Sequence, residues 1–301
     1  MNRLDSMAVL LAAVEAGSLS GAGRKLRMPL PTISRKLSDL EDHLGARLVI
    51  RTSRQMSLTD AGRSYVVACQ NILMQIDEAE RAVAGEYVAP RGGLVIAAPV
   101  VFGRLHMLPV VTEFLKAYPE IEVRLIQSDR NANLLEDHID VAVRIGDLPD
   151  SSHLAIRLGE VRRVVCASPA YLAQRGIPEV PDALSGHECI SFDILTSADG
   201  WSFREGGRDR RVAIRPRLVV NSAEAAIDAA IAGLGLTRVL SYQIVAARRD
   251  SQLQPVLAEF QPSAWPVSLV YAAQGQLPLK LRAFLDFAVP RLKATLKKAA
   301  L

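Results

Sequence analysis

The sequence predicts a small helical segment with a two-stranded wing, then a long linker helix, and finally a larger two-lobed α/β domain. Three observations support this fold class. The first 45 residues hold three short apolar-periodic segments, residues 60–85 carry a heptad-like apolar repeat without proline, and strands alternate with helices beyond residue 90. We therefore expect domains at 1–58, 59–90 and 91–301, with one lobe of the last formed by 91–162 and 267–301 and the other by 163–266.

Glycine, serine and proline delimit the first three helices. Residues 4–16 have apolar side chains at helical spacing, and Gly17 follows where a C-cap glycine would end a helix. Ser18 can cap a short helix over 19–26. Pro31 can occupy the first turn of a third helix, whose apolar stripe ends at Gly45. The tight turn between the second and third segments makes this a helix-turn-helix pattern.

The period of the apolar pattern changes after the third helix. Residues 48–50 and 56–58 flank a polar tip and predict a two-stranded wing. From Asp60 to about Gly85, apolar residues recur at alternating steps of four and three, the spacing of a coiled-coil seam. The seam consists of Tyr65, Cys69, Ile72, Ile76, Ala79 and Val83. It can pack on the core of its own domain, but a long seam between two complete domains favours self-association.

The remainder predicts strands and helices in alternation. Strands are expected at 94–98, 121–127, 139–144, 164–167, 189–192, 217–220, 236–239 and 267–272, and helices at 105–117, 222–232 and 278–296. Two doubly wound lobes would place a ligand where the strand ends of both lobes face each other.

Charge distribution, the start of the chain and its cysteines indicate the cellular compartment of the protein. The net charge of the 301 residues is +4, yet the stretch from Arg24 to Arg63 alone holds nine Lys and Arg against four Asp and Glu. No signal peptide pattern opens the chain, and no apolar run approaches the roughly 18 residues of a membrane span. The three cysteines, Cys69, Cys166 and Cys189, show no CxxC spacing. A cytoplasmic protein without a disulfide framework or a metal site is the expectation.

Motifs of enzymes are missing from the sequence. It contains no GxGxxG, GxSxG, GxxxxGK[ST] or HExxH, and its five histidines are scattered. His187, Glu188 and Cys189 are adjacent, but neighbours on an extended segment point to opposite faces and make a poor metal site. A transport-type binding protein would need a secretory signal and no helix-turn-helix. We therefore expect neither an enzyme nor a transport-type binding protein.

Four motifs in the first 62 residues carry a family resemblance. They are SLSGAGRKL at 18–26, PTISRKL at 31–37, LEDHLG at 40–45, and the stretch from Leu48 through Arg51 to Gly62 that contains LTDAG. In this order and spacing they resemble the signature of the LysR family of transcriptional regulators. DVAVRIG at 140–146, SPAYL at 168–172 and GLG at 233–235 are similar to the effector domain of the same family. The resemblance implies a winged helix-turn-helix, a linker helix and a two-lobed effector domain like that of periplasmic binding proteins.

The resemblance also implies which residues contact DNA. The third helix of this family enters the major groove and the wing touches the neighbouring backbone. Carried over, the DNA-binding positions are Ser18, Pro31, Thr32, Ser34, Arg35, Lys36, Arg51 and Arg54. A helix N-terminus favours phosphate and an arginine can pair bidentately with guanine, which agrees with this assignment. Leu30 departs from the polar residue common there, and it could touch a thymine methyl or simply pack.

The effector crevice is implied by the same resemblance, at strand ends and at the loop after the first strand of the domain. Its positions are Pro99, Val100, Val101, Phe102, Gln127, Ser128, Arg144, Ile145, Gly146, Phe192, Asn221, Ser222, Thr237 and Arg238. Members that bind carboxylates commonly carry Ser or Thr where Val100 and Val101 stand. A more apolar ligand, or none, is therefore an alternative, although the start of the helix at 222–232 would favour a carboxylate, carbonyl or phenolate.

The expected partners follow from the family. It implies a homodimer or a dimer of dimers on double-stranded DNA with an interrupted inverted repeat, with RNA polymerase as a further candidate partner and a small organic effector as the ligand. A redox switch through Cys166 and Cys189, or regulation without a ligand, is the alternative for the C-terminal domain.

Overall fold

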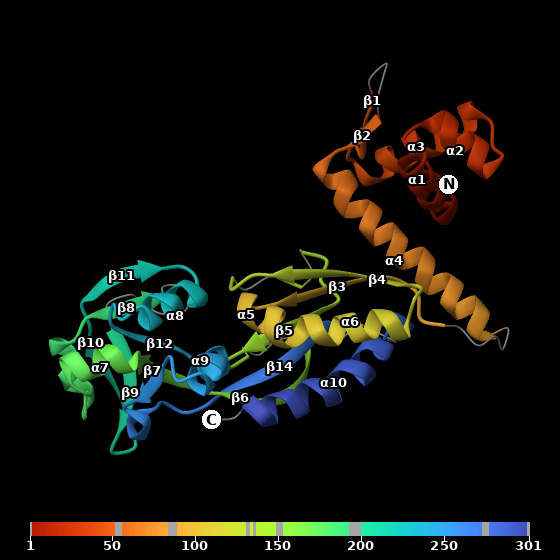
Figure 1. Cartoon of the computed structure of the whole chain (residues 1–301). Coiled ribbons are helices and arrows are strands. Elements are labelled where there is room, and N and C mark those ends of the chain that lie inside the picture. Colours follow the sequence, from red (N-terminus) through yellow and green to blue (C-terminus); the bar gives the residue numbers. More distant parts are fainter. Residues whose placement is uncertain are drawn as a thin grey trace. The chain divides into compact units, whose positions relative to one another are not determined.

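The computed structural model describes residues 2–51, 56–83, 89–130, 133–134, 137–148, 153–192, 200–272 and 277–299. It divides into two compact units, residues 1–92 and residues 93–301 (Figure 1). No single helix of the described residues is long and apolar enough to cross a membrane. One bent pair of helices, Arg3–Glu15 and Leu19–Leu26, reaches the length and apolar composition of a membrane span only when the two are counted together.

The first unit is the helical one with the wing. Its elements are α1 (Arg3–Glu15), α2 (Leu19–Leu26), α3 (Leu30–Leu44), β1 (Val49–Arg51), β2 (Met56–Leu58) and α4 (Asp60–Val83). β1 and β2 pair antiparallel, with Val49 opposite Leu58. The Ser18 side chain caps α2 by accepting a hydrogen bond from the Gly21 N–H at 3.1 Å. Gly45 ends α3 at a φ of +64°, a conformation that favours glycine.

The core of the first unit fixes how α3 lies on its neighbours. Ile33, Leu37 and Leu40 are fully buried on one face of α3. Their spacing of four and three residues matches the helical repeat, so this face packs inward and the opposite face remains exposed. Gly23 of α2 allows the close approach, because a Cβ there would lie 2.8 Å from the Met28 carbonyl oxygen.

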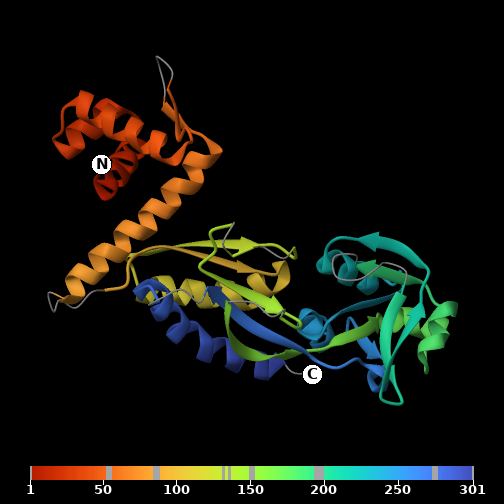
Figure 2. The ribbon, with the colours of Figure 1, turned by 180° about the vertical axis from the view of Figure 1, so that it is seen from behind.

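The second unit contains two five-stranded sheets. The first has the order β4-β3-β5-β14-β6. Its strands are β3 (Gly92–Ala98), β4 (Ile121–Gln127), β5 (Val141–Ile145), β6 (His153–Val161) and β14 (Trp265–Ala272). The helical stretch after β3 runs through α5 (Val100–Phe102), a π-helical turn (Gly103–Met107) and α6 (Leu108–Ala117). α6 and the C-terminal helix α10 (Leu279–Ala299) pack together and lie on the same side of this sheet (Figures 1 and 2).

The second sheet has the order β11-β8-β12-β7-β13. Its strands are β7 (Arg163–Ala167), β8 (Cys189–Phe192), β11 (Pro216–Val220), β12 (Leu236–Leu240) and β13 (Gln254–Val256). Helices α7 (Pro169–Arg175), α8 (Ala223–Ile231) and α9 (Val245–Arg249), three short 3₁₀ turns (Pro181–Gly186, Ser241–Ile244 and Ala258–Phe260), and the hairpin of β9 (Gly200–Glu205) and β10 (Arg208–Ala213) complete it.

The chain passes between the sheets at few points. β6 of the first sheet is followed, after Arg162, by β7 of the second, and the chain returns to the first sheet at β14. β14 runs antiparallel to both β5 and β6, whereas β3 and β5 are parallel. The second sheet is mixed as well, since β12 runs antiparallel to β7 and parallel to β8.

The expected loop after the first strand of the domain is also different. Val100–Phe102 is helical, so the helix expected from Leu105 begins five residues earlier, directly after Pro99. This start places Val101 and Phe102 on the buried face of the helix, where they are 3 % and 0 % exposed.

Candidate nucleic-acid interface and effector crevice

The amino end of α3 presents several of the predicted DNA contacts. Pro31 and Arg35 are exposed, while Thr32 and Ser34 are half-buried beside them. Among the described residues Arg35 has no ion-pair partner, since each acidic side chain that forms a salt bridge does so with another base. An unpaired guanidinium on an exposed helix face can donate two parallel hydrogen bonds to one base or one phosphate. This geometry suits a helix that enters the major groove.

Lys36 differs from Arg35 in its surroundings. Its Nζ lies 3.1 Å from Oδ2 of Asp5 in α1, and its side chain is 20 % exposed. This ion pair directs Lys36 toward α1. Lys36 therefore helps to hold α3 on α1, a role that the sequence gave no reason to expect.

Ser18 and Arg51, two further predicted DNA contacts, lie at the ends of elements. Ser18 is half-buried, and its hydroxyl is engaged as the cap of α2. Arg51 is the last residue of β1, and its side chain is not among those described. Arg54 lies outside the described residues.

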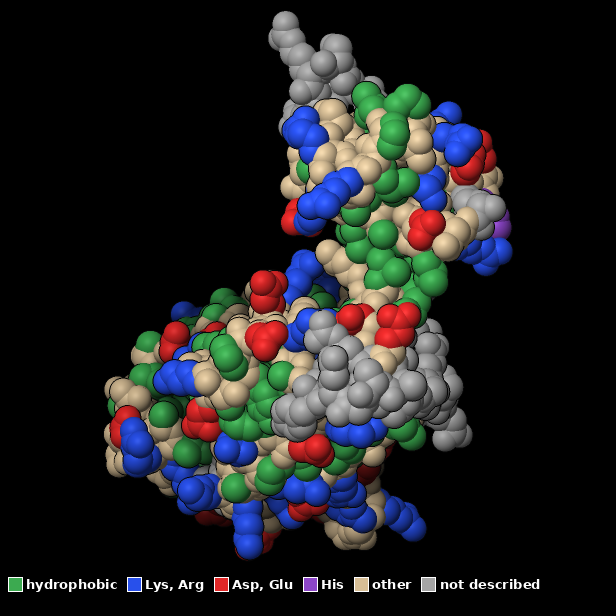
Figure 3. Space-filling model, turned by 90° about the vertical axis from the view of Figure 1, so that its right-hand side faces the viewer, with side chains coloured by type: hydrophobic (Ala, Val, Ile, Leu, Met, Phe, Trp, Pro, Cys, Tyr) green, Lys and Arg blue, Asp and Glu red, His purple; other side chains and the backbone are tan. Residues whose placement is uncertain are grey.

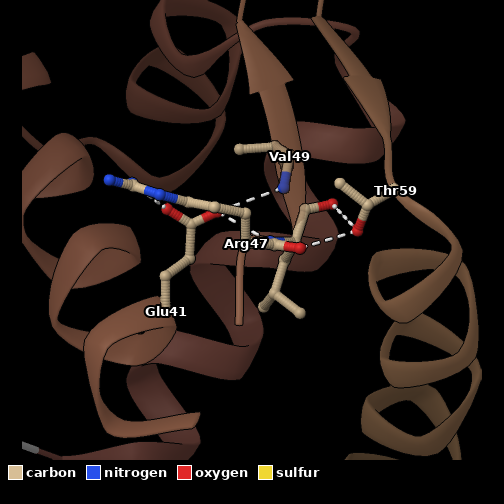
Figure 4. A network of polar contacts seen from close by, with 5 residues as sticks. Glu41, Arg47, Val49 and Thr59 are labelled. Atoms are coloured by element: carbon tan, nitrogen blue, oxygen red, sulfur yellow. Dashed lines mark hydrogen bonds and ion pairs between the residues drawn. The ribbon is translucent and has the colours of Figure 1, made fainter. Parts of the chain in front are cut away.

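Glu41 joins α3 to the start of the wing, and sequence reasoning missed it. Its side chain is 2 % exposed, and its Oε1 accepts hydrogen bonds from the Leu48 N–H at 2.8 Å and the Val49 N–H at 3.1 Å. Oε2 pairs with the guanidinium of Arg47 at 2.9 Å (Figure 4). Burial of the carboxylate raises its pKa, but the two backbone donors and Arg47 outweigh burial and lower the pKa of Glu41 below its usual 4.5.

Thr59 makes the corresponding link from the wing to α4. Its hydroxyl donates to the Arg47 carbonyl oxygen at 2.7 Å and accepts from the Gly62 N–H at 2.9 Å, so it caps α4 (Figure 4). Together, Glu41 and Thr59 tie the residues before β1 to both α3 and α4. The orientation of the wing on α3 therefore depends on two side chains that need not touch DNA.

Replacing Glu41 with glutamine will destabilise the first unit by about 3 kcal/mol at pH 7, because an amide replaces a charged acceptor of two buried N–H groups and of Arg47. A group with a lowered folded-state pKa stabilises above its unfolded pKa, and that stability is lost as pH falls through the folded value. As the pH is lowered below about 4.5, the unfolding free energy of the wild type will therefore decrease by the contribution of the Glu41 carboxylate, which the variant lacks. Urea denaturation at several pH values measures it. Asp42→Asn, on the exposed side of α3, is the control, and an equal loss in both variants would contradict the assignment.

A crevice between the two sheets of the second unit gathers part of the predicted effector residues. Pro99, Ser128, Arg144 and Ile145 line it from the first sheet, and Phe192 lines it from the second. Asp129, Tyr242 and Gln243 line it as well, and the sequence did not reveal them. An inter-lobe crevice with both apolar and charged lining fits a small organic ligand.

Other predicted effector residues lie away from this crevice. Val101, Phe102 and Thr237 are buried in the core, where Thr237 donates its hydroxyl hydrogen to the Ile190 carbonyl at 3.2 Å. Gln127 is exposed and Gly146 ends β5 at a φ of +108°. Asn221 is exposed, and the Ser222 hydroxyl caps α8 by accepting from the Ala225 N–H at 3.3 Å.

Asp129 lies at the amino end of α5. Its Oδ1 accepts a hydrogen bond from the Val100 N–H at 3.0 Å. Burial, and then the charge of Glu224, raise the pKa of Asp129, although the Val100 N–H opposes this shift. A carboxylate of the protein therefore already takes the first donor of this helix and repels a second anion there.

A second pocket lies beside this crevice and shares Phe192, Leu240 and Gln243 with it. Its remaining lining is Arg163, Trp201, Arg238 and Val239. Of these, only Arg238 was among the residues expected from the sequence.

The cysteines of the second unit are placed too far apart for a disulfide. Cys166 on β7 and Cys189 on β8 both lie beside β12, opposite Thr237 and Leu236 respectively, so a whole strand separates them. Two strand spacings amount to about 9–10 Å, beyond the roughly 7 Å limit for a bridge. Burial also raises the pKa of each thiol to about 12, which suppresses the reactive thiolate.

The predicted seam of α4 lies partly in the core of the first unit and partly at its surface. Cys69 is fully buried in the core of the first unit, with Leu37, Leu40 and Leu48 in the same cluster, and Tyr65 packs against it. Further along, Ile72 is 38 % exposed and Ile76 is half-buried. The side chains of Ala79 and Val83 lie outside those described. The part of the seam that remains open to another molecule in this structure therefore includes Ile72.

Comparison with known proteins agrees with this architecture. Residues 4–63 match the model of the bacterial regulatory helix-turn-helix protein, lysR family, and residues 89–293 match the LysR substrate binding domain. The chain therefore belongs to the LysR family. It is a DNA-binding transcriptional regulator with an effector-binding domain, and the family is not one of enzymes.

Relatives and solved structures extend over nearly the whole chain. An HTH-type transcriptional repressor of Pseudomonas aeruginosa is 34% identical, covering 96% of this chain and 92% of the relative. The regulator CrgA of Neisseria meningitidis is also 34% identical, with 96% of each chain covered. Its solved structure matches with a TM-score of 0.62 at 32% identity, over 96% of this chain and 98% of that one. The full-length structure of AphB, a Vibrio cholerae virulence activator, matches with a TM-score of 0.61 at 27% identity, over 95% and 98%.

Proposed function

We propose that this regulator binds an interrupted inverted repeat as a homodimer or a dimer of dimers, with the amino end of one α3 in each of two major grooves. Arg35 carries the proposal: it is exposed on α3 and has no ion-pair partner among the described residues, and Pro31 and Thr32 lie beside it at the start of the helix. Two-fold symmetry of the protein requires symmetry of the operator, and the half-sites must lie one helical turn or a multiple of it apart.

The effector domain of the family binds small molecules, and we propose that the ligand of this chain enters between the two sheets. Pro99, Ser128, Arg144 and Phe192 lie at the ends of strands from both sheets and line the crevice, which supports this position. A ligand that touches both sheets changes the energy of their relative motion, and this couples binding to the spacing of the DNA-binding units. RNA polymerase is the further partner that a regulator bound at a promoter would contact.

We assign self-association to α4 beyond the part that packs on its own core. Ile72 is exposed although it is a large aliphatic residue, and Ile76 follows it one helical turn later. Figure 3 shows further apolar side chains exposed on the first unit. A helix that leaves such residues open is suited to packing against a second copy of itself.

The double variant Ile72→Asp with Ile76→Asp will sediment as a monomer. Two carboxylates in an apolar interface cost several kcal/mol even after their pKa values rise. Sedimentation velocity of the full chain measures the change. Ser64→Asp with Gln70→Asp adds the same charge at exposed positions of the same helix and will leave the oligomer intact. An unchanged mass of the first variant would show that α4 does not form the interface through these residues.

A further inference from the structure

Three aromatic side chains form a contact between the two lobes of the second unit. Phe102 and His106 belong to the helical stretch after β3 of the first sheet, and Tyr242 follows β12 of the second sheet. The ring centres are 5.0 Å apart for Phe102 and His106, 5.3 Å for His106 and Tyr242, and 5.6 Å for Phe102 and Tyr242. Phe102 is 0 % and Tyr242 is 2 % exposed, so each of the three rings touches the other two inside the core.

His106 brings two polar atoms into this apolar contact. Its Nδ1 and Nε2 are both buried, and neither has a hydrogen-bond partner in the part of the chain that the structure describes. The neutral ring already buries one N–H donor and one acceptor there, and protonation would add a second donor and a positive charge. Burial accordingly lowers the pKa of His106 below its usual 6.5.

The charged side chains beside the three rings already have partners. Arg104 lies in the same π-helical turn as His106 and pairs with Glu224 of α8, with 2.5 Å between Nη2 and Oε1. The carboxylate of Asp129 accepts its hydrogen bond from the Val100 N–H. Burial, and then the charge of Asp129, raise the pKa of Tyr242, so the phenol remains neutral.

The other elements around the π-helical turn provide no carboxylate for an imidazolium. α5, α6, β4 and α10 pack on this turn. On α10 only one charged side chain, Lys280, is buried, and it lies 3.4 Å from a carboxylate oxygen of Asp140. The charged side chains of α6 and β4, and the second acid of α8, are exposed: Glu113, Lys116, Glu122, Arg124 and Asp228. Among the described side chains, a protonated His106 would therefore gain an acceptor only if the packing changed.

We propose that His106 makes the contact between the two lobes respond to pH. The neutral ring holds Phe102 and Tyr242 together across the two sheets, whereas protonation drives the ring out from between them and loosens the contact. A proton then acts on the relative motion of the lobes without any occupant of the crevice, so the inference goes beyond the proposed ligand site.

The direction of the effect follows from the lowered pKa. Above about pH 6.5 the ring is neutral in both the packed and the open state, so pH does not change their balance. Below about pH 6.5 the open state binds a proton that the packed state does not, and the packed contact loses stability until the pH reaches its own lower pKa. One proton changes the opening equilibrium by at most about tenfold per pH unit.

Hydrogen exchange of the full chain, followed by mass spectrometry at about pH 7.5 and about pH 5.5, tests this proposal. After correction for intrinsic exchange rates, peptides that cover residues 100–107 and 241–244 will exchange about three- to tenfold faster at the lower pH, because the open state exposes their amides. Peptides from β14 will change less than about twofold, since this strand is paired on both sides.

Two variants isolate the imidazole. His106→Phe keeps a ring in the contact and His106→Leu keeps only an apolar side chain, so loss of packing is distinguished from loss of titration. Both will show equal corrected exchange at the two pH values. His187→Gln is the control, because it removes another histidine of the second unit whose pKa burial lowers, and it will retain the wild-type response.

Three results would overturn the proposal. The first is equal corrected exchange of the wild type at both pH values. The second is a wild-type response in both His106 variants. The third is an equal acceleration in β14, which would indicate general acid unfolding in place of a local opening.

Discussion

Replacing Arg35 with alanine will reduce the preference of the protein for its operator over random DNA by about 10- to 100-fold. One bidentate contact between arginine and a base is worth about 1–3 kcal/mol of discrimination. Arg35 is exposed near the amino end of α3 and has no ion-pair partner in the part of the chain that the structure describes. Affinity for random DNA should change little, since base contacts specify the sequence whereas phosphate contacts position the protein. Fluorescence anisotropy at constant salt, with operator and random duplexes, measures the ratio.

Two further variants make this experiment decisive. Arg157→Ala removes the same charge from an exposed site on β6 and will leave the ratio unchanged. Arg54→Ala, expected from the sequence to contact phosphate, will weaken binding to both duplexes about equally. A wild-type ratio in Arg35→Ala would show that another residue reads the bases.

Replacing Gly62 with alanine will unfold the first unit or cost it about 3 kcal/mol. A Cβ at this position would overlap the Leu48 carbonyl oxygen and lie 2.8 Å from the carbonyl carbon, and backbone atoms cannot move aside as a flexible side chain can. The displaced segment also holds the Leu48 N–H that donates to Glu41, and the Gly62 N–H is the one that Thr59 caps. Operator binding will be lost together with the stability.

Gly93→Ala is the matched control. Nothing lies within 4 Å of a Cβ built on Gly93, so its unfolding free energy should remain within about 0.5 kcal/mol of the wild type. Urea denaturation followed by circular dichroism compares the two variants. Equal stability of Gly62→Ala and the wild type would mean that α4 does not approach Leu48 as closely as the structure shows.

Local patterns predicted much of the fold because they reflect local physics. The helix over 19–26 and the strand over 189–192 lie where the sequence placed them, since capping residues and short apolar runs set their limits. The hairpin of β9 and β10 was missed because its second strand is rich in arginine, although Gly206 and Gly207, at φ of +56° and +81°, are the turn signal that could have revealed it.

The parts of the site that the sequence did not reveal depend on distant partners. Asp129 accepts a hydrogen bond from the Val100 N–H, 29 positions away in the sequence. Arg163 and Arg238 lie near each other only because β7 and β12 are neighbours in the sheet. The sequence predicts a loop at Val101 and Phe102, but both residues lie in α5. The helical repeat places both side chains in the core. Lys36 was assigned to DNA from its place in a motif, and its ion pair with Asp5 is visible only once α1 packs on α3.

DNase I footprinting of the DNA upstream of the coding sequence tests whether α3 recognises an operator. The full protein is added at moderate salt with an excess of random competitor DNA, because nonspecific binding to phosphate weakens steeply with salt. We expect two protected segments of inverted symmetry, with centres about 10.5 base pairs or a multiple of that apart, and loss of both segments in Arg35→Ala. Protection that is uniform, that vanishes with competitor, or that persists unchanged in Arg35→Ala would contradict the reading of α3 as the helix that recognises the operator.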